Sequence, residues 1–157
     1  MSRKLGFVFP GQGSQSVGML SEHFKSSNIF NSVFDISREI LDIDFKELIQ
    51  NGTSEELSAT EITQPLLLTA NHALWKSTNF IPEEIDFMAG HSLGEYSAYI
   101  AAESLSFEDA LFLVSARAKF MQEAVKDGEG GIAAIIGVPQ EKLLKICNAI
   151  SNEGHLV

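Results

Sequence analysis

A serine stands between two glycines in the pentapeptide GHSLG, which occupies residues 90–94. An apolar run precedes it, and a stretch typical of a helix follows. In a nucleophile elbow, small flanking residues let the backbone turn sharply between a strand and a helix, and the serine side chain lies at the tip of the turn. The first N–H groups of the helix then point toward developing negative charge. The pattern therefore favours Ser92 as a nucleophile over a small residue in a tight turn.

A second glycine-rich segment, FPGQGSQ at residues 9–15, follows a short apolar run. A phosphate-binding P-loop needs a Lys-Ser/Thr pair after its last glycine, and a dinucleotide-binding loop needs three spaced glycines; neither pattern is present. Gln12 lies between two glycines, so its backbone can approach a substrate closely. Taken alone, the segment is more typical of an ordinary loop.

Arg117 lies in a stretch, residues 106–125, whose apolar residues recur at helical spacing after a Ser106-x-x-Asp109 capping pattern. Part of the arginine stem should therefore pack against the protein. A half-buried guanidinium needs an anionic partner, because desolvating an unpaired charge is costly. From the residues alone, a structural salt bridge or a stem that extends to water is the more common role of such an arginine.

A serine hydroxyl needs a general base, which in acyl transfer is usually a histidine oriented by a third group. His91 is adjacent to Ser92, where a tight turn directs neighbouring side chains apart, so we expect it beside the substrate and not as the base. His23 and His72 fall in helical patterns typical of surface or packed residues, and His155 lies near the end of the sequence. We therefore expect the base beyond residue 157, and the 157-residue chain alone to be inactive.

The segments around these residues predict an α/β fold. Apolar runs at residues 4–9 and 84–91 predict buried strands, and helical patterns dominate between them and after residue 92. The segment KDGEGG predicts a linker, after which GIAAIIG predicts another strand and VPQEKLLKICNAI another helix. We expect a first domain over residues 1–127 and the start of a smaller subdomain over residues 128–157.

Composition excludes several classes of protein. The 157 residues are 45% apolar and 20% charged, which is ordinary for a domain with a buried core. The net charge of -10 and the lack of a basic run argue against a nucleic-acid partner. A lone Cys147 excludes an internal disulfide and a cysteine-rich zinc site. The first apolar run is too short for a signal peptide or a membrane span, so we expect a cytoplasmic protein with no membrane partner and no metal.

Four segments occur in a characteristic order and spacing: FPGQGSQSVGML, ITQPLLLTAN, AGHSLGEYSA and ARAKFMQEAV. Together they resemble the bacterial malonyl-CoA:acyl carrier protein transacylase family of type II fatty acid synthesis, over nearly the whole chain. The resemblance implies an α/β-hydrolase-like domain that carries the nucleophile, with a smaller ferredoxin-like subdomain inserted downstream. Members of that family are considerably longer, so the sequence resembles an N-terminal portion.

The resemblance also implies a role for each matching residue. Ser92 corresponds to the acylated serine, and the backbone N–H groups of Leu93 and Gln12 correspond to the oxyanion hole. Arg117 corresponds to the arginine that holds the malonyl carboxylate in a bidentate pair, a geometry for which guanidinium is suited. His91 is expected at the substrate. No metal and no redox cofactor is implied; the substrates would be malonyl-CoA and holo acyl carrier protein.

The reaction implied is a ping-pong acyl transfer: the serine attacks the thioester of malonyl-CoA, coenzyme A leaves, and the phosphopantetheine thiol of acyl carrier protein takes the malonyl group. Three alternatives remain. A polyketide-type acyltransferase domain shares most of these motifs. A serine esterase shares the elbow but has no reason to keep Arg117 at the pocket. A non-catalytic fragment or binding module would need no histidine.

Overall fold

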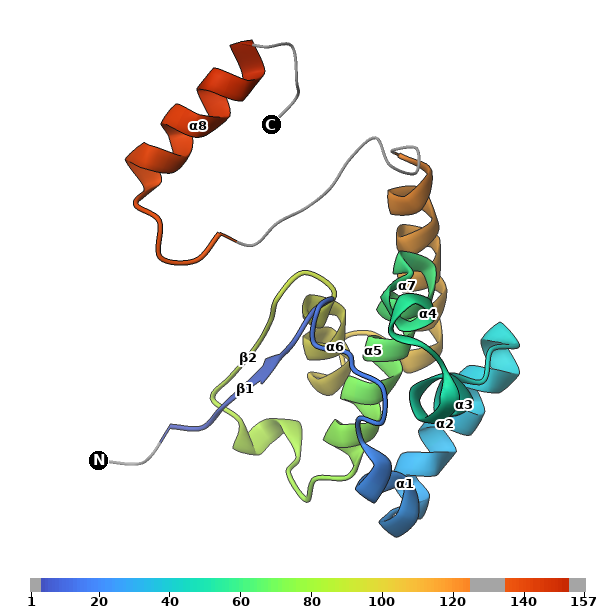
Figure 1. Cartoon of the computed structure of the whole chain (residues 1–157). Coiled ribbons are helices and arrows are strands. Elements are labelled where there is room, and N and C mark those ends of the chain that lie inside the picture. The colour runs from blue at the N-terminus through green and yellow to red at the C-terminus, as the bar shows by residue number, and fades with distance from the viewer. Residues whose placement is uncertain (1–3, 125–134, 153–157) are drawn as a thin grey trace. The chain divides into compact units, whose positions relative to one another are not determined.

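The computed structural model describes residues 4–124 and 135–152 of the chain. These form two compact units, Met1–Val125 and Lys126–Val157. The first unit combines a small parallel sheet with several helices and carries all the residues singled out for chemistry (Figure 1). The architecture is therefore a mixed α/β one, as the sequence predicts.

The sheet of the first unit consists of two parallel strands, β1 (Gly6–Phe9) and β2 (Phe87–Gly90). Their register places Phe9 opposite Gly90, so both strands end at the same edge of the sheet. The glycine-rich loop that follows β1 and the elbow that follows β2 therefore begin side by side. In open parallel α/β sheets this carboxyl edge is where ligands bind.

The two strands are less buried than their apolar sequences predict. Val8 is 74% exposed and Phe87 is 57% exposed, whereas Phe9 is buried. Helix α6 packs against both strands. The expectation of fully buried strands is therefore wrong for the part of the chain described, because a strand needs elements on both faces to lose its contact with water.

Eight helical segments accompany the sheet in the described residues of the first unit. They are α1 (Ser21–Ser26), α2 (Asn28–Leu41), α3 (Phe45–Asn51), α4 (Ser54–Ser58), α5 (Thr60–Lys76), the short 3-10 helix η1 (Pro82–Glu84), α6 (Gly94–Ala101) and α7 (Phe107–Glu123). Helix α5 packs against α2, α6 and α7, so it forms the centre of the unit (Figure 1). Its apolar side chains Leu66 and Leu68 are fully buried together with Phe30, Ile49 and Leu111 from the surrounding helices.

The helix that carries Arg117 begins where its capping pattern predicts. Ser106 Oγ accepts a hydrogen bond from the backbone N–H of Asp109 at 3.1 Å. Ala110, Leu111, Val114 and Ala118 form the buried face of α7. The helix predicted over residues 106–125 is thus confirmed with nearly the same bounds.

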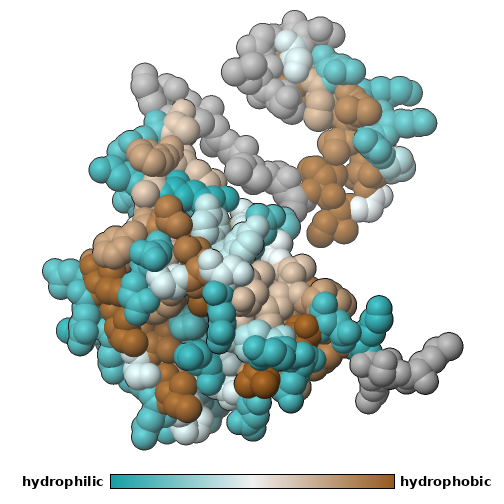
Figure 2. Space-filling model, turned by 180° about the vertical axis from the view of Figure 1, so that it is seen from behind, coloured by the Kyte–Doolittle hydropathy of each residue, from teal (hydrophilic) through white to brown (hydrophobic). Residues whose placement is uncertain are grey.

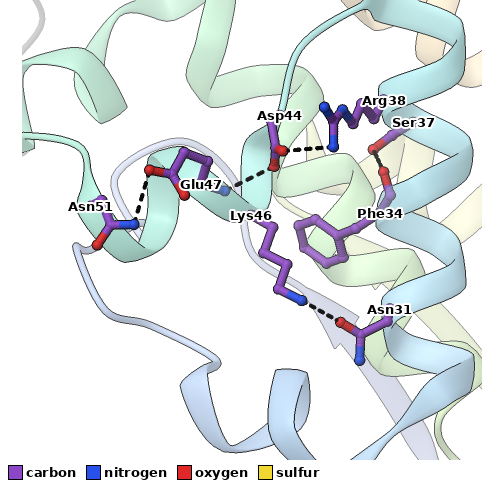
Figure 3. A network of polar contacts seen from close by, with 8 residues as sticks. All are labelled: Asn31, Phe34, Ser37, Arg38, Asp44, Lys46, Glu47 and Asn51. Carbon is purple, nitrogen blue, oxygen red and sulfur yellow. Dashed lines mark hydrogen bonds and ion pairs between the residues drawn. The ribbon is translucent and has the colours of Figure 1, made fainter.

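A polar network joins α2 to α3 on the surface of the same unit (Figure 3). Arg38 Nη1 lies 3.0 Å from Asp44 Oδ2, and Lys46 Nζ donates a hydrogen bond to Asn31 Oδ1 at 2.9 Å. Asp44 Oδ1 also accepts a hydrogen bond from the backbone N–H of Glu47, which caps the N-terminus of α3. An exposed ion pair of this kind contributes only about 0–1 kcal/mol, so the network orients α3 more than it stabilises it.

In the second unit, the structure describes helix α8 (Gln140–Asn152), which confirms the helix predicted after Pro139. The strand predicted over residues 131–137 lies mostly outside the described residues, and residues 135–137 are not part of a strand. None of the helices in the described ranges is long and apolar enough to cross a membrane.

Candidate active site

Ser92 occupies a sharp turn between strand and helix. The strand β2 ends at Gly90 and the helix α6 begins at Gly94, so only three residues connect them. Ser92 has φ = 54°, in the left-handed region that residues other than glycine rarely adopt. Two backbone hydrogen bonds close the turn. The N–H of Gly94 donates to the carbonyl oxygen of His91 at 2.9 Å, and the N–H of Glu95 donates to that of Ser92 at 3.1 Å. This geometry is that of a nucleophile elbow, and it leaves the serine exposed.

Both glycines of the elbow are required by close backbone approaches. A Cβ added to Gly94 would lie 2.2 Å from the carbonyl oxygen of Phe9, at the end of the neighbouring strand. A Cβ added to Gly90 would lie 1.9 Å from the carbonyl carbon of Gly94. Only glycine lets the start of α6 pack directly on the ends of both strands. The G-x-S-x-G spacing therefore has a steric cause in this fold.

The glycine-rich loop after β1 lies against the elbow. The position of a Cβ on Gly11 would be 2.5 Å from the carbonyl oxygen of His91 and 3.2 Å from its Nδ1. Gln12, the next residue, is exposed, and its side-chain Nε2 donates a hydrogen bond to Thr60 Oγ1 at 3.3 Å. The amide side chain is thus directed to α5, and the backbone of the loop borders the residues next to Ser92. Leu93, the other residue expected at an oxyanion hole, is fully buried at the start of α6.

Arg117 reaches Ser92 from a third element. Its Nη2 donates a hydrogen bond to Ser92 Oγ at 2.9 Å, and its Nη1 donates one to Gln64 Oε1. The residue is half-buried on α7. Among the residues described, the salt bridges do not include it, in contrast to Arg38 with Asp44 in Figure 3. A half-buried cation that faces an exposed serine hydroxyl and has no carboxylate partner among the described residues is suited to hold an anionic group.

Three polar side chains of α5 that were not expected at the site hold it together. Thr60 accepts a hydrogen bond from the side chain of Gln12, and Gln64 accepts one from the guanidinium of Arg117. Asn71 Nδ2 donates hydrogen bonds to the carbonyl oxygen of Pro10 at 3.2 Å and to Ser97 Oγ at 3.1 Å. Positions 60, 64 and 71 fall on one face of the helix, but this spacing does not reveal their distant partners. We call Thr60, Gln64 and Asn71 the polar stripe of α5.

The histidines of the described residues do not supply a base for Ser92. None of them has a hydrogen bond to its hydroxyl, which accepts from Arg117. His91 is exposed and turns toward the glycine-rich loop, while the rings of His23 and His72 contact Phe30 and Phe107. His155 lies outside the described residues. A base beyond residue 157 stays a prediction. Within the described ranges, no three His, Cys, Asp or Glu side chains gather as a metal site would need.

Comparison with known proteins places this geometry in a family. Residues 6–152 match the acyl transferase domain family. The malonyl CoA-acyl carrier protein transacylase of Bacillus subtilis (strain 168) is 45% identical over 157 residues, which cover 98% of this chain and 49% of that protein. The protein of the same name from Salmonella typhimurium is 48% identical over 155 residues, covering 98% of this chain and 50% of its own length.

Solved structures agree in fold as well as in sequence. The malonyl CoA-acyl carrier protein transacylase of Coxiella burnetii superimposes with a TM-score of 0.85 at 43% identity, covering 95% of this chain and 48% of that one. A malonyl-transacylase in complex with its type II PKS acyl-carrier protein superimposes with a TM-score of 0.86 at 38% identity, covering 96% and 49%. The chain spans about half the length of these relatives. It belongs to the acyl transferase domain family.

Proposed function

We propose that this chain forms part of an acyltransferase that moves a malonyl group from coenzyme A to the phosphopantetheine thiol of acyl carrier protein in fatty acid biosynthesis. One observation carries the proposal: the guanidinium of Arg117 lies 2.9 Å from the hydroxyl of Ser92. Two relatives are named malonyl CoA-acyl carrier protein transacylase, and a structural neighbour is a malonyl-transacylase bound to its acyl-carrier protein. We place the reaction in the cytoplasm.

The spacing between the cation and the nucleophile suits a malonyl group. In malonyl-CoA, one methylene separates the free carboxylate from the thioester carbonyl that the serine attacks. The group that binds the carboxylate must therefore lie within a few ångströms of the nucleophile, about one hydrogen-bond length away. Arg117 meets this condition, and a guanidinium can pair with a carboxylate through two parallel N–H groups. An esterase acting on neutral acyl groups has no use for this charge.

The reaction proceeds in two half-reactions with a covalent intermediate. Ser92 Oγ attacks the thioester carbonyl carbon and gives its proton to the base, for which we expect a histidine beyond residue 157. The oxyanion of the tetrahedral intermediate is stabilised by the backbone N–H groups of Leu93 and Gln12. The carbon–sulfur bond then breaks, coenzyme A leaves as its thiol after taking a proton, and the malonyl group remains as a seryl ester.

In the second half-reaction, the phosphopantetheine thiol of acyl carrier protein attacks the ester and the serine hydroxyl is regenerated. Arg117 keeps the malonyl carboxylate in place throughout. Its hydrogen bond to Ser92 must be released in part when the carboxylate binds, because Nη2 then turns to the substrate. We expect His91 beside the bound substrate, since it borders the loop of Gln12.

We also propose the finer architecture that this function implies. The elbow between β2 and α6, at the carboxyl edge of a parallel sheet, supports an α/β-hydrolase-like first domain over residues 1–127. Helix α8, which follows the KDGEGG segment in the sequence, supports the beginning of a ferredoxin-like subdomain over residues 128–157. A polyketide-type acyltransferase is the second candidate function, favoured by the structural neighbour bound to a type II PKS acyl-carrier protein.

The test of the proposed function is the selectivity that Arg117 confers. A suitable protein joins residues 1–157 to the second half of the Bacillus subtilis relative; we call it the chimera. In the chimera, Arg117→Ala should lower malonyl transfer to holo acyl carrier protein about 30- to 1000-fold, because a charge-assisted hydrogen-bonded pair is lost. Acetyl transfer from acetyl-CoA should fall much less or rise.

Arg38→Ala is the matched control, since Arg38 is a surface arginine paired with Asp44 away from Ser92. It should leave both rates unchanged. An equal loss of malonyl and acetyl transfer in Arg117→Ala would show that Arg117 is structural. Comparing carrier proteins of fatty acid and polyketide synthesis in the same assay separates the two candidate functions.

A further inference from the structure

Gln64 is the buried partner of the arginine at the site. The residue has 0% exposure, at the second turn of α5 where this helix packs against α7. Its Oε1 accepts a hydrogen bond from Arg117 Nη1, and its Nε2 lies 3.4 Å from Met121 Sδ. Arg117 and Met121 are one turn apart on α7, so the amide bridges two successive positions of that helix.

The chemistry of these partners fixes the orientation of the amide. A guanidinium has only donors, so the carbonyl oxygen of Gln64 must face Arg117. The amino group then faces the thioether of Met121, which is a weak acceptor. The reverse orientation would place two donors against each other in a buried position, which is costly. Nη1 of the arginine is therefore held, and Nη2 is directed to Ser92.

Gln64 is also a neutral partner for a charged group. A glutamate at this position would have nearly the same shape and would form a half-buried ion pair with Arg117. That pair would neutralise the cation and compete with any carboxylate on a substrate. A glutamine holds the guanidinium in place and leaves its charge uncompensated by the described residues.

We propose that Gln64 is a positioning residue that orients Arg117 and, by being neutral, keeps its charge available for a carboxylate on the acyl substrate. The proposal rests on the proposed function for the identity of that substrate. It makes selectivity for carboxylated acyl groups depend on a residue of α5 that does not contact the substrate. The orientation of the guanidinium, in contrast, is a property of the protein alone.

Two variants test this in the chimera. Gln64→Glu keeps the shape and adds a charge; it should lower kcat/KM for malonyl transfer about tenfold or more, mainly through KM, and change acetyl transfer less than about threefold. Gln64→Leu removes the hydrogen bond and should lower the ratio of malonyl to acetyl transfer about fivefold. Thr69→Val is the matched control, because Thr69 is equally buried on α5 and its hydroxyl donates a hydrogen bond to the carbonyl oxygen of Pro65, within the same helix.

A second measurement reports on orientation without any substrate. In ¹⁵N spectra of arginine side chains, the Nη signals of Arg117 should be separate in the chimera and in its Thr69→Val variant, since rotation of the held guanidinium is slow. They should merge in Gln64→Leu. Unchanged Nη signals in Gln64→Leu would overturn the proposal, and so would unchanged selectivity in both Gln64 variants while Arg117→Ala abolishes it.

The two proposals fail in different ways. If Arg117→Ala keeps full selectivity for malonyl groups, the proposed function is wrong. In that case the Nη signals still decide whether Gln64 positions Arg117. Loss of selectivity in Thr69→Val as large as in Gln64→Leu would show that any disturbance of α5 is sufficient, and would overturn the specific role of Gln64.

Discussion

Ser92 combines an unfavourable backbone conformation with an unusual partner for its hydroxyl. Its φ of 54° belongs to a region where a non-glycine residue costs of the order of 1–3 kcal/mol, so the surrounding fold must hold it there. The hydroxyl accepts a hydrogen bond from a cation, which stabilises an alkoxide more than a neutral hydroxyl. Backbone strain and a positive partner at one residue are typical of a reactive site.

His72 is a second residue in an unusual environment, away from Ser92. Its ring stacks on Phe107 with centroids 4.5 Å apart, and its Nδ1 is buried without a hydrogen-bond partner among the described residues. Burial, together with the smaller effect of the nearby charge of Lys76, lowers the pKa of His72 from 6.5 to about 4. The folded protein therefore favours the neutral form of the His72 imidazole.

This pKa shift predicts a loss of stability in mild acid. In the unfolded chain His72 takes up a proton near pH 6.5, and in the folded protein only near pH 4, so the unfolded state binds more protons between these values. The contribution of neutral His72 to the stability of the fold is fully present above about pH 6.5 and falls as the pH drops toward 4. Between pH 7 and pH 5 the free energy of unfolding should decrease by about 2 kcal/mol because of this residue.

Urea unfolding of the chimera at the two pH values measures this decrease. His72→Phe keeps an aromatic ring against Phe107 and cannot be protonated, so the pH dependence should become about 2 kcal/mol smaller. His23→Phe is the control, because His23 is exposed and also contacts an aromatic ring. An equal pH dependence in His72→Phe and in the parent protein would show that His72 is not the titrating group.

At the scale of elements, α5 connects the parts of the site. Its polar stripe, Thr60, Gln64 and Asn71, binds the side chain of Gln12, the guanidinium of Arg117 and the carbonyl oxygen of Pro10 in turn. One rigid helix therefore positions the loop after β1 and the cation on α7. The third component, the elbow, is placed by the contact of α6 with the ends of the two strands.

The contact between α6 and β1 yields a prediction for Gly94. In Gly94→Ala the new Cβ would lie 2.2 Å from the carbonyl oxygen of Phe9. This oxygen belongs to the backbone of a strand, so moving it away costs considerable free energy. We expect a loss of at least about 2 kcal/mol in the free energy of unfolding, together with loss of acyl transfer, since the turn at Ser92 must shift.

Thermal unfolding and transfer assays on the chimera check this prediction. Glu95→Ala is the control: the side chain is exposed on the same turn, and its removal should change stability by less than about 1 kcal/mol. A Gly94→Ala protein with the stability and activity of its parent would contradict the steric account of the elbow.

The comparison of sequence and structure is clearest at these elements. The strand ends, the elbow, and the helices beginning near residues 94, 107 and 140 could be predicted, because each has a local signal such as a glycine pair, a cap or a proline. The polar stripe of α5 was missed. A buried Gln or Asn has meaning only with its partner, and those partners lie between 26 and 61 residues away in the sequence.

The sequence indicated Ser92 and Arg117, which the structure brings together, but not the residues that support them. Ser92 has a motif of its own, whereas Arg117 could be assigned only through a family resemblance, since its helix fits an ordinary ion pair equally well. The structure brings the guanidinium of Arg117 to the serine hydroxyl, which supports the proposed role. The burial of the strands was overestimated, since it depends on elements that pack from outside the strands themselves.

At the scale of the whole molecule, the first unit exposes much apolar surface. Val8 is 74% exposed, Tyr99 58% and Phe120 68%, and Figure 2 shows apolar residues gathered between polar ones on one face. The two strands also leave unpaired edges within the described residues. Apolar surface and open strand edges favour association, so we expect the 157-residue chain alone to be prone to aggregation.

We propose that Ser92 carries the malonyl group between coenzyme A and acyl carrier protein. Incubating the chimera with malonyl-CoA, quenching in acid and mapping the adduct by peptide mass spectrometry tests it most directly, because acid preserves a seryl ester. We predict a malonyl group on the peptide that contains Ser92, and its absence together with loss of transfer in Ser92→Ala. A malonyl group on another residue, or undiminished transfer in Ser92→Ala, would show that Ser92 is not the acylated residue.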